Sequence, residues 1–353
     1  MTIAPPDLVF PASHPSGDTP SKMHKSLLQA AILPEQTALN AWRKWRDSVD
    51  IETLDPQSHH LLSTLYPNLL RHGVEDAQMS RLKGVYRRTW YVNQLLARSF
   101  VQVLHRLQEE EISPLVIGEM GLVSTIYPDY GYRPLYRLDL LVPYSQTLAA
   151  INTLEELGWT NSYRPQPGDR FGKNPLPLWR VTSPNDPLCV PIYLHNHLFS
   201  AKPQSYTDEK LWTDAISTEI GNFPAIVLSP IDQLLHLSLQ NNREGKQRPI
   251  YWLADASLLV QALSEESDWV KLVTQAQRYE IVLPLRYLLK ELGEVLNLSF
   301  PDWVLPSLNQ MAIAYSELLE YNLAGDRKLL LLKAQLLRLR QGLKRLFVGD
   351  FPG

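Results

Sequence analysis

Apolar residues recur at helical spacing near the start of the chain and again toward its end. In the first of these regions the spacing is carried by SLLQAAIL, ALNAWRKW and HHLLSTLYPNLL, followed by a proline-free run from Ala77 to Leu107. Helical spacing returns in IDQLLHLSLQ, IYWLADASLLVQAL and WVKLVTQAQRY. The pattern therefore predicts a helical N-terminal region over residues 25–110 and a helical C-terminal region over residues 229–353.

Between these regions the pattern changes to short apolar runs of the kind that form strands. Residues 111–228 alternate such runs with two short helical stretches, which favours a mixed β-sheet with flanking helices and an α+β fold. The expected strands cover residues 114–118, 137–143, 179–182, 190–195 and 225–228, and the expected helices cover residues 119–126 and 145–157.

Composition and charge narrow the class of protein. Five prolines and few apolar residues fall within the first 21 positions, so we expect residues 1–24 to form a flexible leader. A single cysteine, Cys189, excludes an internal disulfide framework, and no apolar run approaches the ~20 residues needed to cross a bilayer. The absence of a signal-peptide pattern favours a cytoplasmic protein. A net charge of −3 gives no overall attraction to nucleic acid, and no specific nucleic-acid motif is present.

One predicted strand carries charge within an apolar run. Arg137 and Asp139 lie two residues apart in RLDLLV, and side chains two apart on a strand point to the same face. We expect the functional site on that face. The simpler alternative is a partly buried ion pair that only shapes the strand, and the sequence leaves both interpretations open.

The segment around this strand resembles a known family signature. LVIGEMGLVSTIYPDYGYRPLYRLDLLVP, beginning at Leu115, is similar to the motif of an uncharacterised bacterial nucleotidyltransferase family within the polymerase β-like superfamily. In that family a strand ending in Lys-Gly leads to a helix, a Tyr-Pro-Asp turn, an Arg-Pro and a strand with two aspartates one residue apart. The resemblance extends over roughly residues 25–345. It implies a nucleotidyltransferase-like sheet and the transfer of a nucleoside monophosphate from an NTP to an unknown acceptor.

The acidic residues of the motif are incomplete in this chain. The resemblance implies two metal ions held by three acids, but Arg137 stands where the first aspartate belongs and Tyr193 where the third acid belongs. Asp139 is the only catalytic acid that remains, and one carboxylate is a weak ligand for Mg²⁺. We therefore expect impaired or lost two-metal catalysis, with Mg²⁺ as cofactor if the protein is active and none otherwise.

Other motif positions predict contacts with a nucleotide or another phosphorylated ligand. The resemblance places Gly118 at the strand-to-helix turn, where Ile117 replaces the usual lysine, and it matches Arg133 and His195 to family positions. Arg137 and Tyr193 are expected to contribute as well. Arg170 and Lys173 lie in the proline- and glycine-rich loop 164–177, which is either a lid over an anion or a solvated loop. Gly118 and Arg133 also have a purely structural interpretation, as a turn and a turn cap.

A zinc site is a weaker interpretation of the same region. His195 and His197 share a strand face, but Cys189 lies about 26 Å from His197 along an extended strand at ~3.3 Å per residue. The three side chains meet on one ion only if the chain bends at Pro191. Two histidines without that cysteine are more typical of packed or solvated residues.

The end of the chain offers a possible protein-binding helix. Its leucines recur at heptad spacing opposite a strongly basic face, at Leu329, Leu332, Leu336, Leu339, Leu343 and Leu346. Packing against the preceding helices, with the basic face solvated, is the favoured explanation, because three heptads are marginal for a stable coiled coil. A non-enzymatic scaffold that binds a protein partner through this helix is thus an alternative to a catalytically impaired transferase. A third alternative is an active transferase whose acids have moved, for example to Glu119, Asp129 or Asp169.

Overall fold

The computed structural model describes residues 20–160, 176–180, 190–199, 205–240, 250–314 and 317, and for residues 176–180, 205–208 and 240 the backbone alone. Several predicted residues lie outside these ranges. They are Asp169, Arg170, Lys173, Cys189 and the six leucines of the predicted C-terminal helix. The lid, zinc and partner-helix interpretations that rest on them stay predictions.

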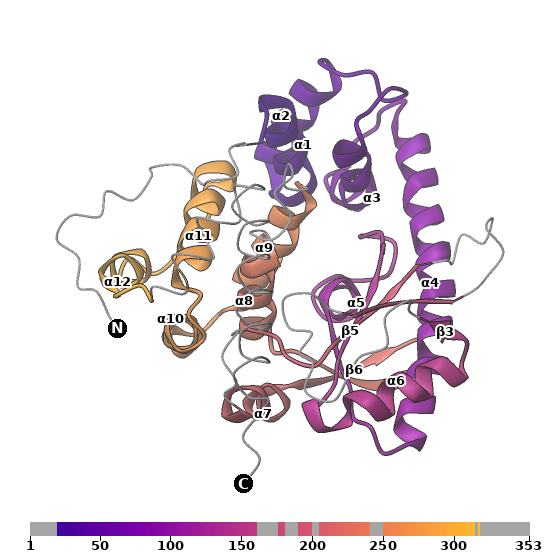
Figure 1. The fold of residues 1–353 in the computed structure, drawn as a ribbon. Coiled ribbons are helices and arrows are strands. Elements are labelled where there is room, and N and C mark those ends of the chain that lie inside the picture. The colour runs from indigo at the N-terminus through magenta and orange to yellow at the C-terminus, as the bar shows by residue number, and fades with distance from the viewer. Residues whose placement is uncertain are drawn as a thin grey trace, which may run out of the picture.

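A mixed β-sheet forms the centre of the fold (Figure 1). Its strand order in the described residues is β3-β4-β5-β2-β1-β7-β6. β2 runs antiparallel to β1 and parallel to β5, while β7 runs parallel to β1. The strands are β1 (Leu115–Ile117), β2 (Leu138–Leu141), β3 (Trp159–Thr160), β4 (Leu176–Arg180), β5 (Ile192–His195), β6 (Ile216–Ile220) and β7 (Phe223–Val227).

Helices precede, interrupt and follow the sheet, as the periodicity predicted. Those before and within the sheet region are α1 (Lys22–Ile32), α2 (Glu35–Arg46), α3 (Pro56–Arg71), α4 (Met79–Glu109), α5 (Gly118–Val123), the 3₁₀ turn η1 (Tyr144–Gln146), α6 (Thr147–Glu156) and α7 (Ser205–Asp214). Those after it are α8 (Pro230–Gln240), α9 (Tyr251–Ala262), α10 (Glu266–Arg278), α11 (Val282–Leu296) and α12 (Val304–Gln310). The α+β fold predicted from the sequence is therefore observed.

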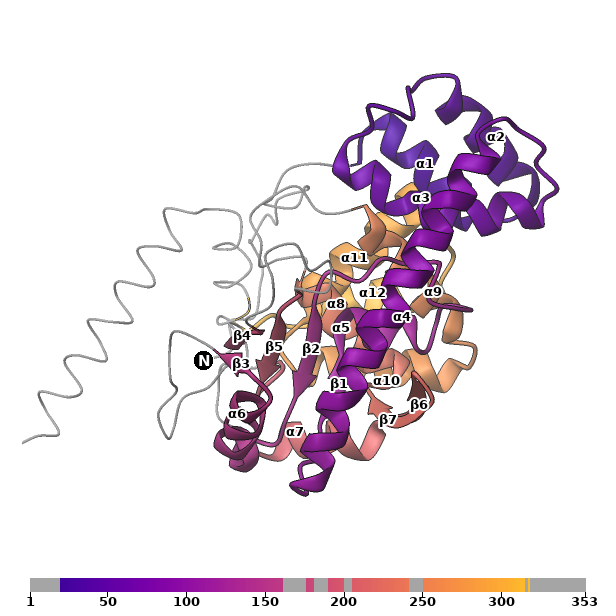
Figure 2. The same ribbon diagram turned by 90° about the vertical axis from the view of Figure 1, so that its right-hand side faces the viewer.

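The two faces of the sheet belong to different apolar cores. Val116, Leu140 and Leu194 point into a core shared with α4 and α6. Ile117 and Leu141 point to the opposite face, into a larger core made by α1–α3 and α8–α12. Figure 2 shows α4 in front of the sheet, running along β1, with α8 and α11 behind it. Since side chains alternate along a strand, Asp139 shares the face of Leu141 and points toward the larger core.

The helical regions predicted as separate segments at the two ends of the chain pack together. α1 contacts α9 and α11, and all three contribute to the larger core. α1 also begins at Lys22, within the predicted leader, because the Ser21 hydroxyl accepts a hydrogen bond from the His24 backbone N–H and caps the helix. The N-terminal and C-terminal helical regions therefore share one apolar core.

Two strands were not predicted from the sequence. β3 contains only Trp159 and Thr160, too few residues to show a period. β6 is an edge strand whose residues are mostly exposed or half-buried, and it joins β7 through Gly221 and Asn222. Both turn residues have positive φ, at 54° and 65°, which is typical of a type I′ hairpin turn. This Gly-Asn pair was the available signal for the hairpin.

Among the described residues no helix combines the length and apolar character required to span a lipid bilayer.

Candidate active site

Five of the predicted site residues meet where β1 ends and β2 runs beside β5; Figure 2 shows these strands. Gly118 follows β1 directly with φ of +65°, a conformation that favours glycine. A Cβ added at this position would lie 2.9 Å from the Asp139 Oδ2 atom. Glycine is therefore required here for two reasons: the backbone conformation and the close approach of the Asp139 carboxylate.

Asp139 is fully buried, and its carboxylate is held by two neighbours. Arg137 binds it bidentately, with Nε donating to Oδ2 at 2.7 Å and Nη2 donating to Oδ1 at 2.5 Å. The His195 Nε2 atom lies 2.9 Å from Oδ1. Since an ionised carboxylate can only accept, His195 is the donor in this contact. Both oxygens of the surviving acid are therefore already engaged by protein groups.

The electrostatics of the pair keep both partners charged. Burial alone would raise the pKa of the Asp139 carboxyl, but the charge of Arg137 and the hydrogen bonds from His195 and Arg137 hold it well below its usual range. Burial likewise disfavours the charged form of Arg137. The nearby negative charge of Asp139 outweighs this effect of burial and raises the pKa of Arg137. Asp139 is thus an ionised carboxylate neutralised by a fixed cation.

Tyr193 lies beside this pair. The β2–β5 register pairs Asp139 with Tyr193, so their side chains share one sheet face. The Arg137 guanidinium carbon lies 4.4 Å from the centre of the Tyr193 ring, in cation–π contact. The structure thus brings Gly118, Arg137, Asp139, Tyr193 and His195 together.

Arg133 belongs to a different cluster in the protein interior. Its guanidinium donates to both carboxylate oxygens of Asp255 at 3.1–3.2 Å, and its Nη1 lies 3.1 Å from a Glu119 oxygen. The Tyr127 hydroxyl also donates to Asp255, at 2.6 Å. Arg133 is 3% exposed, so a phosphate would have to displace buried carboxylates to reach it. This geometry favours the structural interpretation of Arg133.

Two of the three acids suggested as replacements serve local structure. Glu119 Oε2 accepts hydrogen bonds from the backbone N–H groups of Tyr136 and Arg137, which fixes the entry to β2. Asp129 accepts from the Tyr86 hydroxyl and from the Gly131 backbone N–H, each at 2.6 Å. Neither carboxylate contacts Asp139 in the described structure. The third, Asp169, lies outside the described residues.

The site does not fit a magnesium pair. Among the described residues, no group of three or more His, Cys, Asp or Glu side chains could hold a metal ion. Mg²⁺ depends on anionic oxygen ligands, whereas the single carboxylate here is buried and bound by a guanidinium. A cation placed beside Asp139 would also be repelled by Arg137.

Sequence reasoning missed several residues that shape the site. The His60 ring of α3 packs at a tilt against Tyr136 and Tyr251, with its centre 4.5 and 5.5 Å from the centres of their rings. Burial, together with the nearby His59 and Arg133, lowers the pKa of His60 to about 4, so its ring is neutral at pH 7. Asp255 had a usable signal, because a carboxylate inside the otherwise apolar α9 must have a buried partner.

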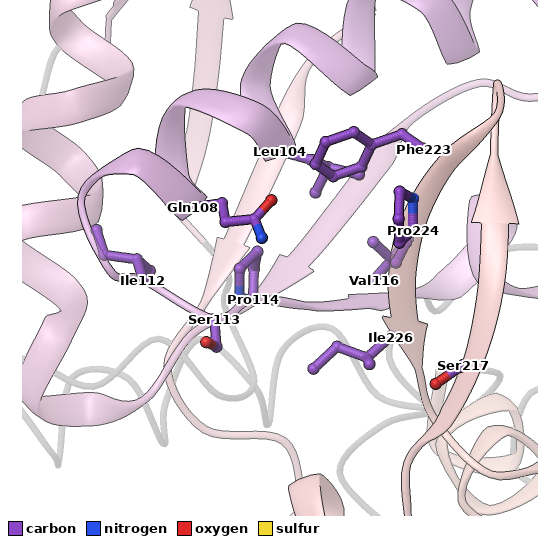
Figure 3. Close-up of a pocket in the computed structure, with 11 residues that line it drawn as sticks. Leu104, Gln108, Ile112, Ser113, Pro114, Val116, Ser217, Phe223, Pro224 and Ile226 are labelled. Carbon is purple, nitrogen blue, oxygen red and sulfur yellow. The ribbon is translucent and has the colours of Figure 1, made fainter.

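A separate apolar pocket lies on the other side of the sheet (Figure 3). It has a volume of about 240 Å³ between the end of α4 and strands β1 and β7. Leu104, Val116, Phe223 and Ile226 line it, and no charged side chain does. It therefore offers no cationic side chain to a phosphate.

Comparison with known proteins places this geometry in a family. Residues 56–297 match the family model described as an uncharacterised nucleotidyltransferase. None of the curated proteins matches the chain in sequence. Among solved structures, the antibiotic-resistance factor ANT(2'')-Ia is 12% identical, with a TM-score of 0.37 over 52% of this chain and 94% of that one. An antigenic nucleotidyltransferase-like protein from Paracoccidioides brasiliensis is 11% identical, with a TM-score of 0.37 over 63% and 95%.

The family match includes every site residue named above, from His60 to Asp255, and covers more than half of the chain. The protein belongs to this family of uncharacterised nucleotidyltransferases.

Proposed function

We propose that this protein is a nucleotidyltransferase-family member that has lost two-metal nucleotidyl transfer. The observation that supports the proposal is the bidentate Arg137–Asp139 pair, with His195 on the same carboxylate. Two-metal transfer requires carboxylates that share a pair of divalent ions and neutralise charge on the transferred phosphoryl group. Here a guanidinium supplies the positive charge permanently and occupies both oxygens of the remaining acid.

Residual nucleotide binding at this site is expected to be weak and independent of metal. Arg137 keeps an exposed side, because 28% of its side chain is accessible and its Nη1 atom takes no part in the contact with Asp139. However, two guanidinium groups, of Arg133 and Arg137, lie among the three carboxylates of Glu119, Asp139 and Asp255. Taken together, these two neighbouring clusters offer an anion no net positive charge. A phosphate would depend on Arg137 and on the predicted contributions of Arg170 and Lys173.

The proposal is tested by measuring metal and nucleotide binding together. Mn²⁺ binding is followed by electron paramagnetic resonance, and ATP, GTP, CTP and UTP are titrated by calorimetry with and without Mg²⁺. We expect no tightly bound Mn²⁺ and nucleotide affinities that Mg²⁺ does not increase. Pyrophosphate release from an NTP that requires Mg²⁺ and is lost in Asp139→Asn would overturn the proposal.

A further inference from the structure

A second pocket lies outside the candidate active site, between α3 and α4. The two helices pack side by side (Figure 1), and Tyr132, from the turn that precedes β2, adds to the lining of the pocket between them. The pocket has a volume of about 470 Å³, within the range of small-molecule sites. Its lining residues are Tyr66, Pro67, Leu70, Arg71, Lys83, Tyr86, Arg87 and Tyr132.

The charged lining of this pocket is entirely basic. Arg71 ends α3, while Lys83 and Arg87 lie one helical turn apart on α4, and all three are exposed. Within the part of the chain that the structure describes, none of the three has a carboxylate at ion-pair distance. Some other arginines of the N-terminal helices are paired, as Arg46 is with Asp76. Three unpaired cations around one cavity are the charge pattern that a phosphate group complements.

The remaining wall is aromatic and held in place by its surroundings. Tyr86 packs against Tyr66 and Tyr132, with ring centres 5.4 and 6.0 Å apart. The Tyr86 hydroxyl donates to Asp129, and a Cβ at Gly131 would overlap the Tyr86 ring. The acid of the Tyr-Pro-Asp turn and the glycine after it thus position a tyrosine of α4.

The backbone of Tyr132 is fixed from the opposite side. Its carbonyl oxygen accepts hydrogen bonds from the hydroxyls of Ser63 and Thr64 on α3, at 3.0 and 2.8 Å. Side chains held in this way offer a preformed surface for a flat ring, with little ordering cost on binding. Asp129 adds one negative charge behind Tyr86, but its carboxylate is occupied by the Tyr86 hydroxyl and the Gly131 N–H.

We propose that this pocket binds a phosphorylated ligand that carries a flat ring, of mononucleotide size. Arg71, Lys83 and Arg87 would hold the phosphate, and Tyr86 and Tyr132 would contact the ring. Such a ligand has two sources, a free nucleotide or the phosphorylated end of a nucleic acid strand. The site shares no residue with the Arg137–Asp139 cluster, so the inference does not rest on the proposed function.

The test uses the full-length protein and AMP as the probe, with binding measured by calorimetry at low salt and without metal. We expect Lys83→Gln and Arg87→Gln each to weaken binding about fivefold to tenfold, as the loss of one exposed charge-assisted contact requires. Tyr132→Leu is expected to weaken it by a similar factor, about the value of one base–aromatic stack. Arg88→Gln is the matched control, because Arg88 is an exposed neighbour on α4 that does not line the pocket.

The outcomes separate this inference from the proposed function. Loss of binding in the pocket variants, with binding by Arg88→Gln unchanged, supports the pocket even if the active-site proposal fails. Absence of AMP binding, or binding that Arg137→Gln reduces and the pocket variants do not, overturns it. Ribose 5-phosphate binding as tightly as AMP would also overturn it, because the ring would then contribute nothing.

The source of the ligand follows from a second titration. A 5′-phosphorylated tetranucleotide that binds more tightly than AMP, and loses this advantage in Arg87→Gln, assigns the pocket to a strand end. Tighter binding of AMP assigns it to a free nucleotide. If both probes bind equally well to the wild type and to Arg87→Gln, the pocket does not hold the phosphate and the proposal fails.

Discussion

Arg137 binds both carboxylate oxygens of Asp139, the residue two positions along the same extended segment. In the family signature that the sequence resembles, the position of Arg137 belongs to the first of two aspartates, and Asp139 is the second. The substitution therefore reverses the sign of a charge where two metal ions would require anions. The remaining carboxylate is stabilised by a cation that belongs to the protein and cannot dissociate.

Restoring the acids is expected to create a divalent-ion site. Tyr193 is paired with Asp139 across β2 and β5, and Arg137 contacts the Tyr193 ring, so both substituted positions face the surviving carboxylate. The double variant Arg137→Asp with Tyr193→Asp would place three carboxylates together. We expect it to bind Mn²⁺ in electron paramagnetic resonance titrations, while each single variant binds much more weakly. A double variant that keeps the wild-type circular dichroism spectrum yet binds no Mn²⁺ would show that these positions are not the metal positions.

The Arg137–Asp139 pair is expected to contribute to stability as well. Arg137→Met leaves a buried carboxylate without its cation, and breaking a buried pair from one side costs about 3–5 kcal/mol. Because 28% of the Arg137 side chain is exposed, water compensates in part and we expect a loss of about 1–3 kcal/mol. Urea unfolding at pH 7 measures this change.

Two companion variants complete the test of this pair. They are Asp139→Asn alone and Asp139→Asn combined with Arg137→Met. Asp139→Asn removes the charge that Arg137 neutralises, so adding Arg137→Met to it should cost less than Arg137→Met alone. The folded-state pKa of Asp139 is lowered, so its stabilisation is present above the unfolded pKa of 3.8 and is lost as the pH falls. Equal effects of Arg137→Met in both backgrounds would mean that the contact contributes nothing.

Gly118→Ala is expected to destabilise the fold more than the same change at another glycine with positive φ. Gly118 and Gly158 have φ of +65° and +84°, and an added Cβ has no neighbour within 4 Å at Gly158. Gly158→Ala should thus cost only the backbone strain, about 1–2 kcal/mol. At Gly118 the Cβ also meets the Asp139 carboxylate at 2.9 Å, so we expect about 1–2 kcal/mol more. Thermal unfolding compares the stability losses of Gly118→Ala and Gly158→Ala. In an Asp139→Ala background the additional loss of Gly118→Ala should disappear, while the loss of Gly158→Ala should stay the same.

The strand that carries Arg137 and Asp139 was predicted from the sequence, but several contacts around it were not. The alternation in RLDLLV was enough to place Arg137 and Asp139 on one face, because side-chain direction on a strand depends only on spacing. His60 and Asp255 were missed because they contact Tyr136 and Arg133, which precede the site strand, from α3 and α9, far away in the sequence. Local pattern does not encode such contacts, which depend on how the two helical regions pack against the same sheet face.

Arg133 illustrates the same limit within the motif itself. The family position allowed either a phosphate contact or a structural role, and nothing in the nearby sequence distinguishes them. The distinction depends on Asp255, 122 positions away, whose carboxylate meets the guanidinium in the interior. Only the packed structure shows that this cation already has an anionic partner.

A buried acid in α8 is expected to make stability depend on pH. Asp232 is fully buried, and burial raises its pKa to about 6, although the Ser229 hydroxyl donates to its Oδ2 atom at 2.6 Å and opposes the shift. Its Oδ1 atom has no hydrogen-bond partner among the described residues. The folded state thus binds a proton more tightly than the unfolded chain, whose aspartate has a pKa of 3.8.

The direction of the effect follows from this difference. The stabilisation is complete below pH 3.8 and is lost as the pH rises through about 6, by about 1–3 kcal/mol in total. Asp232→Asn cannot ionise, so its stability relative to the wild type should increase between pH 4.5 and pH 7.5 in urea unfolding. Ser229→Ala removes the hydrogen bond that lowers the pKa, and it should move the midpoint of this change to higher pH. A stability difference between Asp232→Asn and wild type that stays constant over the range would show that Asp232 does not titrate there.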